Sequence, residues 1–218
     1  MSALPIAIEL ERQKVLIIGT GSLAHERIVS LLDTGAVMEL YGSHDPDSPV
    51  ESDIREGRVT YYHREVCEQD FVGAKLVFVT DIHRLSPHIA VIQKWAHQHH
   101  AWLHVADVPS LCDFYAVSQL RRGDLVIGIS TSGKAPSLAK QVRLALESLF
   151  DGSWASLVSK LYYYRCQRSE QAISVKSAHL QQWAQHYVHK HLVPRIVRAQ
   201  GEMDPAYSDI PWRQEEMP

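Results

Sequence analysis

The chain has 218 residues, of which 45% are hydrophobic and 22% charged, and this ordinary globular composition argues against disorder. A formal net charge of −3 gives no support to a nucleic-acid partner, which would require a basic excess. No apolar run approaches the roughly 20 residues of a membrane helix, and residues 1–5 lack the basic and apolar segments of a secretory signal. The three cysteines are far apart, so we expect a cytoplasmic protein with neither a disulfide framework nor a metal site.

Short apolar runs alternate with helical patterns over the first half of the chain. The predicted strands are residues 14–18, 37–41, 58–62, 76–79 and 102–105. Residues 22–32 and 89–96 are predicted helices, and Gly35 ends the first of them. This alternation predicts an α/β fold with a Rossmann-like, doubly wound parallel sheet.

The pattern changes after Phe114. Residues 115–120 and 125–130 predict a hairpin, and a helix is expected over residues 137–150. We therefore predict three parts, which are a Rossmann-like domain over residues 1–113, a small α+β region over 114–150, and a helical C-terminal domain with its tail over 151–218.

The first predicted strand leads directly into a glycine-rich turn. Residues 19–24 read Gly-Thr-Gly-Ser-Leu-Ala, a G-x-G-x-x-A pattern between a strand and a helix. Gly19 permits the tight turn, Gly21 lets the backbone approach a pyrophosphate, and the helix N-terminus offers free N–H donors. This context favours dinucleotide binding over a plain strand–helix turn.

An acid that binds the adenosine ribose is expected about 20 residues further on, at the end of the second strand. Glu39 has that spacing but lies inside the predicted strand, whereas Ser43 and Asp45 follow it and could reach the ribose. The pattern favours NAD over NADP without settling the choice.

Further stretches carry motifs. Leu4-Pro5 precedes the first predicted strand, and Thr80-Asp81 ends the fourth. Residues 104–114 are similar to N-V-x-D-x-P-x-x-x-x-F, and residues 130–139 are similar to S-T-G-G-K-S-P-x-L-A. Together with the glycine turn, these stretches resemble the precorrin-2 dehydrogenase / sirohydrochlorin ferrochelatase family, the N-terminal module of siroheme synthase. His104, Ser132 and Val117 stand where that family has Asn, Gly and Pro.

The resemblance implies NAD-linked oxidation of precorrin-2 to sirohydrochlorin, and some members also insert iron. It implies a homodimer formed through residues 114–150, and Asp107 as the catalytic residue. The candidate cofactor-binding residues are Gly19, Thr20, Gly21, Ser22, Leu23, Ser43, His44, Thr80 and Asp81. The candidate substrate-binding residues are Thr131, Ser132, Gly133 and Lys134.

Asp107 also has a plausible role from its position alone. It follows the fifth predicted strand, at the edge where open α/β sheets bind ligands. A carboxylate there could accept the proton lost as hydride leaves the macrocycle. The alternative is that Asp107 only stabilises the turn before Pro109.

Other functions stay open at this point. The chain could be a non-redox module that carries or senses a tetrapyrrole or a dinucleotide, or a chelatase only. A dehydrogenase for a different small substrate would rest on the glycine turn alone.

Overall fold

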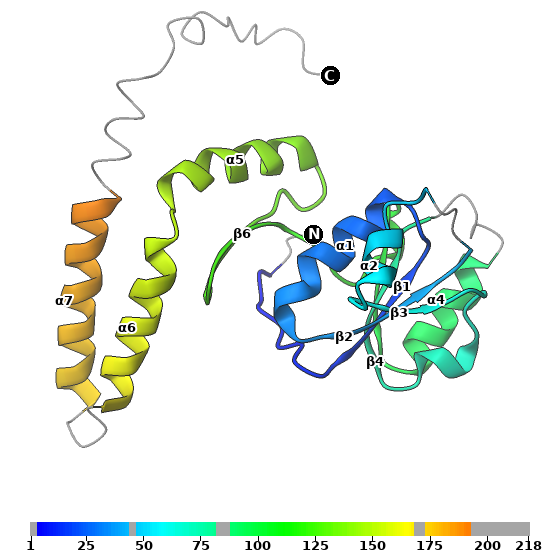
Figure 1. Ribbon diagram of the computed structural model, residues 1–218, viewed down its shortest axis with the longest axis horizontal. Coiled ribbons are helices and arrows are strands. Elements are labelled where there is room, and N and C mark those ends of the chain that lie inside the picture. The colour runs from blue at the N-terminus through cyan, green and yellow to red at the C-terminus, as the bar shows by residue number, and fades with distance from the viewer. Residues whose placement is uncertain (1–3, 44–46, 82–87, 168–172, 193–218) are drawn as a thin grey trace, which may run out of the picture. The chain divides into compact units, whose positions relative to one another are not determined.

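The computed structural model describes residues 4–43, 47–81, 88–167 and 173–192 (Figure 1). The chain forms two compact units, Met1–Ala116 and Val117–Pro218, which are described separately. The three-part division stays a prediction.

The first unit is built on a five-stranded parallel sheet with strand order β3-β2-β1-β4-β5. The strands are β1 (Lys14–Ile18), β2 (Val37–Tyr41), β3 (Thr60–Tyr62), β4 (Ala74–Val79) and β5 (Trp102–Val105). Ile18 of β1 pairs with Tyr41 of β2 and with Val79 of β4. The carboxyl ends of these three strands therefore meet at one edge of the sheet, where α/β folds bind ligands.

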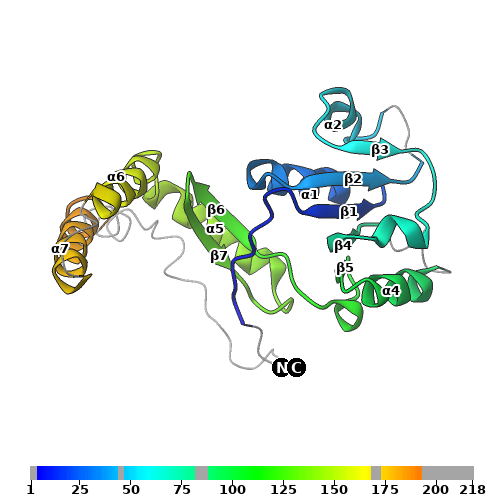
Figure 2. The ribbon, with the colours of Figure 1, turned by 90° about the horizontal axis from the view of Figure 1, so that it is seen from below.

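Helices cover both faces of this sheet (Figure 2). Val15 and Ile17 of β1 are buried with residues of α1 (Ser22–Leu31), whereas Leu16 and Ile18 are buried with residues of α4 (Ile89–Gln98). A strand that is apolar on both faces reads as a continuous hydrophobic run, which is the pattern that predicted it. The α/β, Rossmann-like fold is confirmed.

Short elements complete the first unit. They are the helix α2 (Glu51–Arg55) and the 3-10 helices η1 (Leu32–Thr34), η2 (Glu68–Phe71) and η3 (Pro109–Leu111). Gly35 ends η1 with a left-handed φ of 69°, as the sequence predicted. Fully buried Asp53 ties α2 to its surroundings, because its carboxylate pairs with Arg58 at 2.9 Å and with the His25 Nδ1 at 2.7 Å.

The second unit contains an antiparallel hairpin and three helices. They are β6 (Ser118–Arg122), β7 (Leu125–Ile129), α5 (Pro136–Leu149), α6 (Ser153–Gln167) and α7 (Ile173–His191). The Arg122 Nε donates to the Phe150 carbonyl at 2.6 Å and so caps the end of α5. Buried Trp154 packs against Phe150 and Tyr187, with ring centroids 4.9 and 5.4 Å apart.

No described helix is long and apolar enough to cross a membrane. Within the described ranges, no three His, Cys, Asp or Glu side chains come together as metal ligands. Cys67, Cys112 and Cys166 are all free thiols.

Candidate functional site

Gly19 is confined where β1, β2 and β4 end. Its φ is +114°, and a Cβ on this residue would lie 2.5 Å from the Thr80 Oγ1 and 3.0 Å from the Asp81 backbone nitrogen. Its own N–H donates to the Tyr41 carbonyl at 2.9 Å. Both the backbone angle and the lack of space require glycine here.

Gly21, unlike Gly19, has open space around it. A Cβ on Gly21 would meet nothing within 4 Å, and its φ of −85° is open to any residue. No side chain caps α1, and its first turn carries no acid, while Ala24 is fully buried below. An uncapped helix N-terminus beside an open glycine fits the pyrophosphate of a dinucleotide.

A cavity of about 170 Å³ adjoins this turn. Its lining comes from the glycine turn, the end of β2, the segment after β3, the end of β4 and one face of α4. The lining residues are Ile18, Gly19, Thr20, Tyr41, Gly42, Ser43, Glu65, Val66, Asp81, His88, Val91, Ile92 and Trp95. The structure thus brings together residues that lie far apart in the sequence.

Four candidate cofactor residues, Gly19, Thr20, Ser43 and Asp81, line the cavity. Ser22 and Leu23 are exposed in the first turn of α1, beside Gly21. Thr80 does not line the cavity, because its Oγ1 donates back to the Ile18 carbonyl at 3.1 Å beneath Gly19. His44, like Asp45, lies outside the described residues.

Side-chain hydrogen bonds tie the glycine turn to the end of β2. The Thr20 Oγ1 donates to the Ser43 carbonyl at 2.7 Å, and the Ser48 hydroxyl donates to the Thr20 carbonyl. The Tyr61 hydroxyl donates to the carbonyl of Gly42 at 2.7 Å. These bonds fix one wall of the cavity before any ligand arrives.

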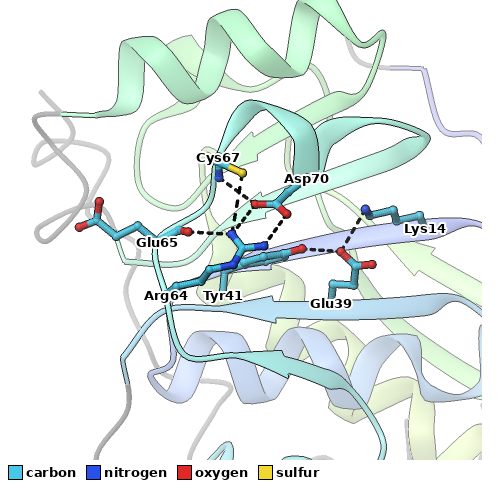
Figure 3. A network of polar contacts seen from close by, with 7 residues as sticks. All are labelled: Lys14, Glu39, Tyr41, Arg64, Glu65, Cys67 and Asp70. Atoms are coloured by element: carbon cyan, nitrogen blue, oxygen red, sulfur yellow. Dashed lines mark hydrogen bonds and ion pairs between the residues drawn. The ribbon is translucent and has the colours of Figure 1, made fainter.

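A polar network lies behind Tyr41 (Figure 3). The Arg64 guanidinium donates to both Asp70 oxygens at 2.7 Å, and lies 5.1 Å from the Tyr41 ring centroid. Tyr41 donates from its hydroxyl to the Glu39 carboxylate at 2.6 Å, and Glu39 also pairs with Lys14 at 3.1 Å.

The charged groups of this network stabilise one another's charged forms. Hydrogen bonds from Arg64 keep the pKa of Asp70 well below its usual range, and the same carboxylate raises the pKa of Arg64. Burial and the bond to Glu39 raise the pKa of Tyr41. The sequence did not predict this network, since its members come from two strands, a loop and the 3-10 helix η2.

Asp107 lies beyond the carboxyl end of β5 and is exposed. Its φ of +60° is unusual for a residue other than glycine, although aspartate tolerates this region better than most residues. Backbone in such a conformation costs about 1–3 kcal/mol and is often found at functional sites. The Asp107 side chain is therefore exposed to solvent at the carboxyl edge of the sheet, where α/β folds bind ligands.

His104 on β5 is half-buried among aromatic rings. Its ring centroid lies 5.6 Å from that of Phe78 and 5.7 Å from that of Phe114. Burial, followed by the nearby Arg27 guanidinium, lowers the pKa of His104 to about 4. The imidazole is therefore neutral near neutral pH.

Cys112 serves the local fold. Its Sγ accepts the Val105 N–H at 3.3 Å, and burial raises the pKa of the thiol. An unreactive, half-buried thiol agrees with this environment.

The candidate substrate loop lies in the second unit, between β7 and α5. Ser132 and Gly133 have left-handed φ angles of 53° and 76°. The Thr131 Oγ1 accepts the Ala135 N–H at 3.1 Å, and Lys134 is exposed. The family's glycine at the position of Ser132 is understandable, because glycine adopts this backbone without strain.

Residues 6–118 match the model of a family described as NAD(P)-binding, which spans more than half of the chain. The chain belongs to this NAD(P)-binding family. The family agrees with the dinucleotide binding that the glycine turn predicted.

Within that class, the relatives are precorrin-2 dehydrogenase and siroheme synthase. The chain is 29% identical to precorrin-2 dehydrogenase of Bacillus subtilis (strain 168), over 74% of this chain and 98% of that one. It is 30% identical to siroheme synthase of Psychrobacter arcticus over 72% of this chain, but spans only 28% of that protein. The solved structure "SirC, precorrin-2 dehydrogenase" shares the fold, with a TM-score of 0.70, 22% identity, and coverage of 91% of this chain and 98% of that one. The predicted family resemblance is confirmed.

Proposed function

We propose that this chain catalyses the NAD-dependent oxidation of precorrin-2 to sirohydrochlorin in siroheme biosynthesis. The observation that carries the proposal is the open glycine turn and cavity, on a chain that matches nearly the whole length of the Bacillus subtilis enzyme. NAD, when bound, supplies the hydride acceptor.

The backbone of the first turn of α1 would hold the pyrophosphate. In this proposal Gly21, Ser22 and Leu23 present their N–H groups to it, and Gly19 allows the turn. Thr20, Ser43 and Asp81 contact the adenosine side from the cavity wall, Thr80 supports Gly19 from below, and His44 keeps its proposed cofactor contact.

Asp107 would act as the general base. Oxidation of precorrin-2 removes a hydride and a proton, and an ionised carboxylate can accept that proton. Its exposure at the carboxyl edge of β5 supports this role, because a substrate can reach it there. A carboxylate that only stabilised its turn would not influence turnover.

Precorrin-2 carries many carboxylates, so basic and hydroxyl groups would hold it. We assign this task to Thr131, Ser132, Gly133 and Lys134, of which Lys134 supplies the positive charge. We also propose a homodimer through residues 114–150. A two-stranded sheet such as β6–β7 is marginal alone, and Val126 and Leu138 are 43% and 56% exposed.

The proposed setting is the cytoplasm, without nucleic-acid or membrane partners. Three free thiols and a net charge of −3 support it.

The test is anaerobic turnover of enzymatically prepared precorrin-2 with NAD, followed by the sirohydrochlorin spectrum. Asp107→Asn should slow turnover by about 100-fold or more while the affinity for NAD stays within about twofold. Asp33→Asn changes another exposed aspartate, on η1, and should leave both unchanged. Equal turnover of Asp107→Asn and wild type would remove Asp107 from the mechanism.

A second arm adds ferrous or cobaltous ion to sirohydrochlorin. The siroheme synthase relatives are the observation that makes metal insertion the second candidate. Metal insertion without any NAD-dependent oxidation would favour a chelatase and reject the dehydrogenase.

A further inference from the structure

The cavity beside the glycine turn has an acidic lining. Its ionisable side chains are Glu65, Asp81, His88 and the phenol of Tyr41, and the lining residues described above include no lysine or arginine. Glu65 is exposed and lies in the segment that follows β3, the strand next to β2 in the sheet. It therefore reaches the cavity from the side where the adenosine ribose is expected.

Glu39, the acid with the expected spacing for a ribose contact, is engaged elsewhere. Its carboxylate accepts the Tyr41 hydroxyl at 2.6 Å and pairs with Lys14 at 3.1 Å, and its side chain is only 15% exposed. Glu39 does not line the cavity. A ribose held there would meet Glu65 rather than Glu39.

Arg64 is a cation close to the cavity, and its guanidinium lies over the Tyr41 ring, 5.1 Å from the centroid (Figure 3). Two bonds of 2.7 Å join it to Asp70, and a third, of 3.0 Å, goes to the Glu65 carbonyl. The Glu65 carboxylate points away from this network. Tyr41, over whose ring the guanidinium lies, lines the cavity, whereas Arg64 is not among the lining residues. Asp70 thus keeps a positive charge away from the ribose side.

We infer that Glu65, together with the Arg64–Asp70 pair, selects a dinucleotide with a free 2′-hydroxyl and rejects its 2′-phosphate. A free hydroxyl can donate a hydrogen bond to the Glu65 carboxylate, as acids do in NAD sites. A 2′-phosphate would be repelled by the same carboxylate, and the charge of Arg64 is already paired with that of Asp70. The inference rests on the proposed use of a nicotinamide dinucleotide in this cavity.

Calorimetric titration of the full chain with NAD and with NADP measures this selectivity without turnover. Wild type should bind NAD at least about tenfold more tightly than NADP. Glu65→Gln should tighten NADP about tenfold and weaken NAD a few-fold. Glu68→Gln, a neighbouring acid that pairs with His99 outside the cavity lining, is the matched control and should change neither.

Asp70→Asn tests the role of the held cation. Release of Arg64 should tighten NADP about tenfold, and adding Arg64→Gln should abolish that gain. Denaturation curves check that each variant folds. If Asp70→Asn does not fold, the ratio of NADP to NAD affinity measured for Glu65→Gln decides whether the inference holds.

The outcomes separate this inference from the proposed function. A wild type that binds neither dinucleotide contradicts the proposed function itself, and the selectivity with it. A wild type that binds both equally, or a Glu65→Gln variant with an unchanged NADP to NAD ratio, overturns the inference alone. A folded Asp70→Asn variant without any gain in NADP affinity overturns the role of Arg64.

Discussion

Substitution of the two glycines in the turn should give opposite results. Gly19→Ala forces an alanine to a φ of +114° and brings its Cβ to 2.5 Å from the Thr80 Oγ1. An unfavourable backbone angle costs about 1–3 kcal/mol, and crowding in a packed region costs a similar amount. We therefore expect Gly19→Ala to lower the free energy of unfolding by about 3 kcal/mol.

Gly21→Ala should leave stability nearly unchanged and impair cofactor binding. Its φ of −85° suits alanine, and its Cβ would meet nothing within 4 Å. The effect on unfolding should stay within about 1 kcal/mol. The same methyl group would occupy the space where the pyrophosphate approaches, so we expect the affinity for NAD to fall at least tenfold, by about 1.4 kcal/mol or more.

The assays are urea denaturation followed by circular dichroism, and calorimetric titration with NAD. Two results would refute the reasoning. An unchanged unfolding midpoint for Gly19→Ala would mean that the turn is not confined by Thr80. An unchanged NAD affinity for Gly21→Ala would mean that the pyrophosphate does not lie against this turn.

Two further predictions concern stability. Because the folded-state pKa of His104 is lowered to about 4, the unfolded chain takes up the proton first, and stability falls as the pH drops from about 6.5 toward 4. Denaturation curves should show that the free energy of unfolding falls by about 1–2 kcal/mol between about pH 7.5 and pH 5. His104→Asn should reduce this loss, and an equal loss in that variant would contradict the assignment to His104. Asp53→Asn should cost about 2–4 kcal/mol, since it leaves Arg58 without its buried partner. Glu51→Gln removes a half-exposed carboxylate that pairs with exposed Arg55, and it should cost under about 0.5 kcal/mol. Equal effects of Asp53→Asn and Glu51→Gln would count against the argument.

The sheet and the glycine turn could be predicted because their signals are local. β1 is a continuous apolar run that ends at Gly19, and such a run identifies a strand buried on both faces. Gly35 likewise marked the end of the first helical segment. By contrast, α2 has only five residues and no apolar period, so nothing in the sequence distinguished it from a loop.

The cavity was less predictable because its walls come from separate elements. Ile92 and Trp95 of α4 line it, yet their helical spacing is also that of ordinary core residues. Glu39 had the right spacing for a ribose contact, but its bonds to Tyr41 and Lys14 depend on strand pairing. Glu65 carried no motif at all, and only the folded sheet brings it beside the glycine turn.

The central claim is that this chain couples oxidation of precorrin-2 to reduction of NAD. The most direct measurement is the ratio of NADH to sirohydrochlorin formed anaerobically by purified wild-type protein, with Gly21→Ala measured in parallel. We expect the two products in equal amounts, and far slower formation of both by Gly21→Ala at the same NAD concentration. Sirohydrochlorin formed at the same rate without NAD, or no sirohydrochlorin above the uncatalysed rate from a protein that binds NAD, would contradict the account.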